Sequence, residues 1–157
     1  MAKLISADLT NNKLCILEYT TTDGRMLSFE EDAFDAKIVS QTYTDIGKIS
    51  FDKPITRIGY KAFDCCSSLT SVTIGNSVTT IGEEAFFYCK SLTSVTIGKS
   101  VSEIGKEAFK ECNIDTIVCC PKIPPKIDDS FGKFENLIVP TGCEEAYANS
   151  DWGQYLE

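Results

Sequence analysis

The sequence predicts a single α/β solenoid of about five coils with a short parallel strand ladder, and three observations point to it. The first is a period of 23 residues, the second is the near-identity of segments 69–75 and 92–98, and the third is the loss of the period toward both ends. Five columns carry the period: Ile58, Ile81 and Ile104; Gly59, Gly82 and Gly105; Ala62, Ala85 and Ala108; Phe63, Phe86 and Phe109; Cys66, Cys89 and Cys112. Repeats of this length are typical of units that stack along one axis.

Each repeat is predicted to contain one β-strand and one short turn. Val72 and Ile74 alternate with Ser71 and Thr73, so one face of the strand points to the core and the other carries hydroxyl groups. The segments 83–86 and 106–109, which end in Ala-Phe, suit one helical or 3-10 turn. A single coil cannot bury both its strand and its Phe, whereas stacked coils join them into a continuous core.

The pattern Leu-x-x-Val-x-Ile, Val-x-x-Ile-Gly and Ala-Phe-x-x-Cys resembles the BspA-like leucine-rich repeats found in surface proteins of anaerobic bacteria and in some protists. Two near-perfect copies span residues 55–101, and a shortened third reaches residue 120. The resemblance implies a leucine-rich-repeat solenoid without catalytic residues. It also implies a role in adhesion or protein binding, at the cell surface or in secreted form.

We expect one domain over residues 1–157, with irregular ends. Residues 1–45 are predicted to form a β-hairpin-like N-terminal cap and an irregular first coil, in which apolar segments 14–17 and 26–29 flank the turn at Asp23-Gly24. Residues 46–120 hold the regular repeats. Residues 121–157 are predicted to form a last degenerate coil, with a strand that ends at Pro140, and a C-terminal cap that begins at Glu144 and includes Trp152.

Composition argues against several classes of function. The chain has no histidine, and its 15 basic and 23 acidic side chains give a net charge of −8. Histidine is the usual general base of Ser and Cys hydrolases and the commonest transition-metal ligand, so we expect no enzyme, no cofactor and no metal site. The negative charge repels phosphate backbones and anionic membrane surfaces, so neither nucleic acid nor an anionic membrane surface is an expected partner. Membrane insertion is not expected either, because no apolar run approaches 18 residues. The start of the chain has no signal-peptide pattern, which predicts the cytoplasm by default.

Eight cysteines form the most reactive group in the sequence. Cys66, Cys89 and Cys112 share one repeat position, and we interpret them as small reduced residues that fill a column of the core. Two alternatives remain open, a structural disulfide and a thiol-based redox function.

The outward face of the strand ladder is the predicted partner-binding surface. In-register strands would place Ser50, Thr73, Thr96 and Val118 in one row, with Lys48, Ser71, Ser94 and Thr116 beside them. A solenoid of stacked repeats offers an extended surface of this kind for binding, here to a protein or a surface glycan. The alternative is a scaffold whose Ser and Thr residues only suit exposed strands.

Overall fold

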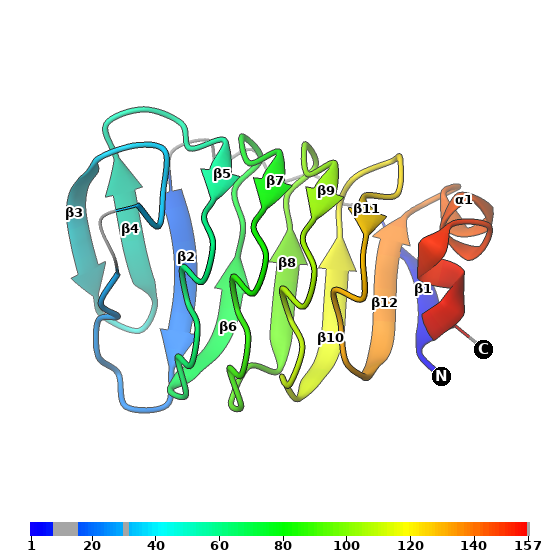
Figure 1. Cartoon of the computed structure of the whole chain (residues 1–157), viewed down its shortest axis with the longest axis horizontal. Helices are drawn as coiled ribbons and strands as arrows, with labels where there is room; N and C mark the ends of the chain where they lie inside the picture. Colours follow the sequence, from blue (N-terminus) through cyan, green and yellow to red (C-terminus); the bar gives the residue numbers. More distant parts are fainter. Residues whose placement is uncertain (8–15, 30–31, 157) are drawn as a thin grey trace.

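The computed structural model describes residues 1–7, 16–29 and 32–156, and these form a solenoid with two sheets (Figure 1). The larger sheet has eight strands in the order β1-β12-β10-β8-β6-β2-β4-β3, and the smaller has four in the order β11-β9-β7-β5. The larger sheet contains β1 (Lys3–Ala7), β2 (Ile16–Thr21), β3 (Ile38–Tyr43), β4 (Gly47–Phe51), β6 (Leu69–Thr73), β8 (Ser94–Ile97), β10 (Ile114–Cys119) and β12 (Phe134–Pro140). The smaller contains β5 (Arg57–Ile58), β7 (Thr80–Ile81), β9 (Glu103–Ile104) and β11 (Lys126–Ile127).

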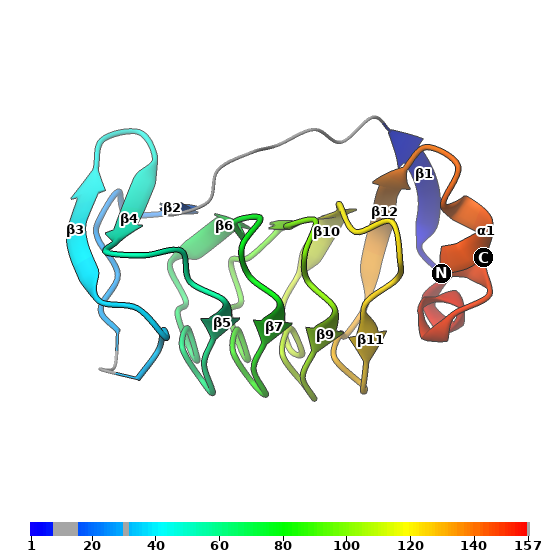
Figure 2. The ribbon, with the colours of Figure 1, turned by 90° about the horizontal axis from the view of Figure 1, so that it is seen from above.

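One coil of the solenoid crosses both sheets, as the passage from β6 to β7 shows (Figure 2). The leucine-rich-repeat solenoid is therefore confirmed, with about four turns in place of about five. The difference arises because residues 38–51 do not complete a coil but form an antiparallel pair, β3 with β4.

The Ala-Phe segments form hydrogen-bonded turns. In one of them the Ala85 amide donates to the Gly82 carbonyl (3.3 Å), and the Phe87 amide donates to the Glu84 carbonyl (3.0 Å). Glu84, the acceptor of the second bond, has a φ of 53°. This left-handed conformation prevents the turn from continuing as a helix. The same conformation recurs in the neighbouring coils, at Lys61 and Glu107.

The core is continuous through the stack. The rings of Phe63, Phe86, Phe109 and Phe131 lie one above the next, with centroid separations of 4.6, 4.8 and 5.1 Å. Between the two sheets, equivalent aliphatic residues of successive coils are buried: Ile58, Ile81 and Ile104; Val72, Val95, Ile117 and Leu137. Because each column repeats an apolar residue, every coil buries its apolar face against the equivalent face of the next coil.

The N-terminal cap is hairpin-like, but other residues build it. The expected pairing of 14–17 with 26–29 is wrong, because β2 pairs with β4 on one side and with β6 on the other, antiparallel to both. Residues 11–15 lie outside the described part of the chain. Tyr19 of β2 contacts both neighbouring strands. Its buried ring occupies the space where a side chain on Gly47 of β4 would lie, and the residue is paired with Val72 of β6. The hairpin of this cap is formed by β3 and β4.

The first strand lies at the opposite end of the molecule. β1, expected within the N-terminal cap, pairs in parallel with β12, and the Ala2 amide donates to the Tyr155 carbonyl. Both ends of the chain therefore lie together (Figures 1 and 2). The C-terminal cap contains α1 (Glu144–Ala148) and the 3-10 helix η1 (Asp151–Tyr155). It is anchored by the buried side chain of Trp152, whose indole Nε1 donates to the Pro125 carbonyl at 2.9 Å.

Candidate partner-binding surface

Two rows of side chains run across the outward face of three consecutive coils. Thr73 lies opposite Thr96 and Thr96 opposite Val118, which is the row that the period predicts. The parallel row is also formed: Ser71 lies opposite Ser94, and Ser94 opposite Thr116. We call these six residues the strand face. The alternate residues of each strand turn inward to the core, so these six side chains face outward. All six are half-buried.

Ser50 does not belong to the strand face. The expected row placed it beside Thr73, but β2 lies between their strands, and Ser50 lies opposite Ile16 instead. Thr73 has Glu18 as its neighbour, and Lys48 lies on the other side of Glu18. The period counted along the chain could not reveal this insertion, because β2 comes from outside the repeats.

Residues outside the repeats lengthen both rows. Thr20 lies opposite Ser71, and its hydroxyl is 2.6 Å from the Ser71 hydroxyl. At the other end, Asn136 lies opposite Thr116 and Ile138 opposite Val118. The sequence pattern missed Thr20, because nothing in residues 16–21 marks them as partners of β6.

The strand face is electrically neutral. Its five hydroxyl groups donate and accept hydrogen bonds, and none of them titrates near neutral pH. Charge begins at its border, where the Lys48 ammonium lies 3.6 Å from the Glu18 carboxylate. A surface of this kind can form hydrogen bonds with a partner but supplies neither a nucleophile nor a general base.

The seven cysteines of the described residues are all free, and Cys15 lies outside that part. Cys89 and Cys112 are buried, and each thiol donates to a backbone carbonyl of the preceding coil, at 3.1 Å to Phe63 and to Phe86 respectively. These contacts agree with the interpretation of the column as reduced core residues. The alternative of a disulfide is not formed among the described cysteines.

Three of the described thiols, those of Cys65, Cys66 and Cys119, give little support to the redox alternative, whereas the hydrogen bond between Cys89 and Cys112 lowers the pKa of the buried Cys112 thiol. Burial raises the pKa of the Cys66 thiol to about 11, and burial likewise raises the pKa of Cys119. The exposed Cys65 has its pKa raised by its hydrogen bond to the Asp64 carboxylate, 3.3 Å away. Because the thiolate is the reactive form, a raised pKa makes these cysteines slow nucleophiles at neutral pH.

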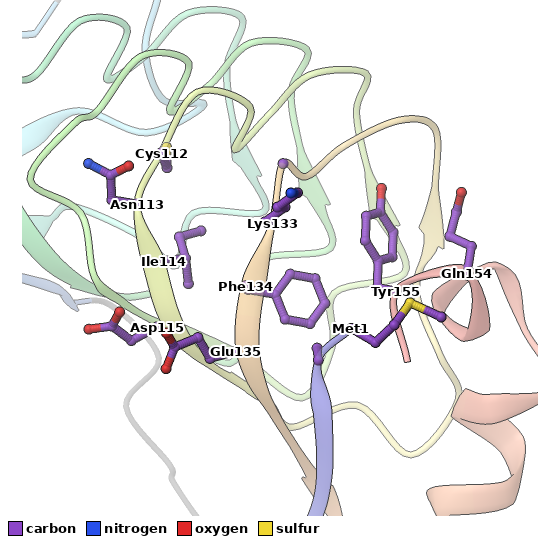
Figure 3. A pocket seen from close by; sticks show the side chains of 12 residues that line it. Met1, Cys112, Asn113, Ile114, Asp115, Lys133, Phe134, Glu135, Gln154 and Tyr155 are labelled. Atoms are coloured by element: carbon purple, nitrogen blue, oxygen red, sulfur yellow. The ribbon is translucent and has the colours of Figure 1, made fainter. Parts of the chain in front are cut away.

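A shallow groove of about 690 Å³ lies near the chain ends, between the start of β12 and the C-terminal cap (Figure 3). Met1, Phe134 and Tyr155 form its apolar part, and the rings of Phe134 and Tyr155 have centroids 5.3 Å apart. Asp115 and Glu135 contribute carboxylates. The sequence could not predict this groove, because it depends on the first and last residues meeting.

Neither a metal site nor a membrane span is found in the described part of the chain. Among residues 1–7, 16–29 and 32–156, no group of three or more His, Cys, Asp or Glu side chains is placed to hold a metal ion. Over the same residues, no helix has both the length and the apolar character needed to cross a bilayer.

Comparison with known proteins identifies the repeat. The family model described as a BspA type leucine rich repeat region matches residues 13–138, in six copies. A crystal structure of a leucine rich cell surface protein from Faecalibacterium prausnitzii A2-165 aligns with 19% identity and a TM-score of 0.37, over 76% of this chain and 44% of that chain. A leucine-rich repeat protein from Bacteroides ovatus ATCC 8483 aligns with 24% identity and a TM-score of 0.40, over 85% of this chain and 42% of that chain. The chain thus spans less than half the length of either solved protein. No protein with a curated description matches.

Proposed function

Because the chain belongs to the BspA-type leucine-rich repeat family, we propose that it is a non-enzymatic binding module that recognises a protein through its strand face. One observation carries the proposal: parallel registration aligns half-exposed hydroxyl side chains into two rows over three coils. Repetition at the strand spacing of about 4.8 Å offers a partner the same donors and acceptors several times. The resemblance to the family implies the cell exterior as the place of this interaction.

The composition of the strand face indicates the kind of contact. None of its six residues is Trp, Tyr or Arg, the types that dominate tight protein interfaces. Affinity would therefore come from many weak hydrogen bonds over an extended area, as in multivalent adhesion. A surface glycan is the less favoured partner, because the six residues include no aromatic ring on which a sugar could stack.

The test is a binding experiment with a matched control on the other side of the coil. The double variant Thr73→Arg/Thr96→Arg places two large cations on the strand face of neighbouring coils. Its control is Thr79→Arg/Ser102→Arg, which makes the same change in charge at two exposed positions, also 23 residues apart. Both variants and the wild type are immobilised and exposed to extracellular-matrix proteins and to neutral polysaccharides.

We expect the wild type and the Thr79→Arg/Ser102→Arg control to retain the same matrix protein and the strand-face variant to lose it. Thermal unfolding of all three proteins checks that the fold is kept. Retention by all three would overturn the strand face as the site. Retention by none would favour the scaffold alternative, and retention of a polysaccharide alone would replace the protein partner with a glycan.

A further inference from the structure

The two edges of the eight-stranded sheet differ in how they are covered. At the β1 edge lie both chain ends and the two short helices, α1 and η1 (Figure 1). The other edge is β3, which pairs only with β4 among the described strands. Since both ends of the chain lie at the opposite end of the molecule, chain continuing from either terminus would start far from β3.

β3 also lacks the usual protection of an edge strand. Its residues, Ile38–Tyr43, include no charged side chain and no proline, and Val39 is 65% exposed. Unpaired backbone amides and carbonyls on such an edge are a template for another strand. The register shift between Ile38 and Ser40 is its one protective device, and it leaves Ser40–Tyr43 as regular strand.

The charges beside β3 favour one occupant, a second copy of the same strand. Lys37 precedes the strand and Asp45 follows it, both exposed, and neither takes part in an ion pair within the described residues. When two copies of β3 pair antiparallel, the start of each meets the end of the other. Lys37 then approaches Asp45 of the partner subunit, and the two-fold symmetry repeats this contact at the other end.

We propose that two copies of the chain associate through β3 in an antiparallel pair, so that their larger sheets join into one. The two-fold axis would stand perpendicular to the joined sheet, which puts the outward faces of both copies on the same side. This interface lies outside the strand face, and its existence does not depend on the function proposed above. A dimer of this form would present two strand faces together and increase avidity for a repetitive partner.

Sedimentation velocity over a range of concentrations tests the association. We expect the weight-average mass to rise from one chain toward twice that value for the wild type. Val39→Lys adds a charge to the exposed edge and should weaken association about tenfold or more, whereas Val39→Thr, which stays uncharged and β-branched, should keep it.

A charge exchange tests the antiparallel geometry itself. Asp45→Lys alone should weaken the dimer, because it places two lysines together at each end of the interface. The double variant Lys37→Asp/Asp45→Lys restores opposite charges and should recover dimerisation toward the wild-type level. Thermal unfolding verifies the fold of each variant, and Thr73→Arg/Thr96→Arg should leave the dimer unchanged.

Three results would overturn the proposal. One is a wild type that stays a single chain at submillimolar concentration, which would leave β3 open to an extended peptide of another protein. The second is a dimer that Val39→Lys and Asp45→Lys do not weaken, because the contact would then lie elsewhere. The third is a charge exchange that fails to restore a dimer weakened by Asp45→Lys in folded protein.

Discussion

The ring of Phe86 lies flat against the ring of Phe109, with the centroids 4.8 Å apart and the planes 4° apart. Both side chains are fully buried. The spacing equals the distance between neighbouring strands, so the coils can approach as closely as their backbone hydrogen bonds require while the rings remain in contact. The column of rings therefore links one coil to the next, and it gives the solenoid a core that no single coil could form.

Replacing Phe86 should test this column directly. Phe86→Ala removes a buried ring between two others and should lower the free energy of unfolding by about 3 to 5 kcal/mol. Phe87→Ala is the matched control, because Phe87 is the next residue but is only half-buried, and its loss should cost clearly less. Urea unfolding followed by circular dichroism measures both, and equal losses would contradict a specific role for the column.

Gly105 should tolerate no side chain. A Cβ at this position would lie 2.5 Å from the Glu83 amide nitrogen and 2.8 Å from the Gly82 carbonyl carbon, so neighbouring coils would have to separate. We expect Gly105→Ala to destabilise the protein by about 1 to 3 kcal/mol. Gly132→Ala is the control, since its Cβ would meet nothing closer than 3.9 Å. The order of the two melting temperatures decides the question, and a Gly105→Ala variant as stable as the control would refute the close approach.

Cys65 should be more stable as glycine. It has a φ of 57°, a left-handed conformation that costs a residue with a Cβ roughly 1 to 2 kcal/mol. Its side chain is exposed and donates a hydrogen bond to the neighbouring Asp64. Cys65→Gly should therefore raise the free energy of unfolding by about 1 kcal/mol, after the greater freedom of glycine in the unfolded chain is subtracted. Cys65→Ala keeps the Cβ and should bring no gain, so equal stabilisation by both would contradict the conformational explanation.

Stability should fall at alkaline pH. Burial raises the pKa of Cys119 from its ordinary value of 9.0 and that of Tyr147 from 10.0, so the folded protein keeps these protons to higher pH than the unfolded chain. Below these ordinary values both states are protonated and stability does not change through these groups. Above them the unfolded state loses protons first, and the free energy of unfolding decreases.

Urea midpoints from neutral pH to about pH 11 measure this decline. Cys119→Ala removes one of the titrating groups and should make the decline less steep, whatever its effect on stability at neutral pH. A decline of unchanged slope in Cys119→Ala would show that this thiol is ionised to the same extent in both states.

Much of one coil could be predicted from local pattern. The alternation of Ser71, Val72 and Thr73 predicted which side chains face outward, and the spacing of Phe63, Phe86 and Phe109 predicted their column. The candidate rows were correct wherever both neighbours belong to the repeat, as for Thr73 and Thr96. They failed at Ser50, because the strand beside β6 is β2 and not the preceding coil.

The sequence by itself determined the repeat, the inward and outward positions within each coil, and the parallel register of β6, β8 and β10. It could do so because a residue repeated every 23 positions lies beside its equivalent in the next coil, so residues 23 apart in the sequence are neighbours in the structure. Only the tertiary structure decided the ends: β2 inserted beside β6, β1 added to β12, and β3 left at an open edge. These pairings join segments that do not share the 23-residue period. Pairing between distant strands depends on which strand edge has free backbone hydrogen-bonding groups, and this cannot be predicted from a local sequence pattern.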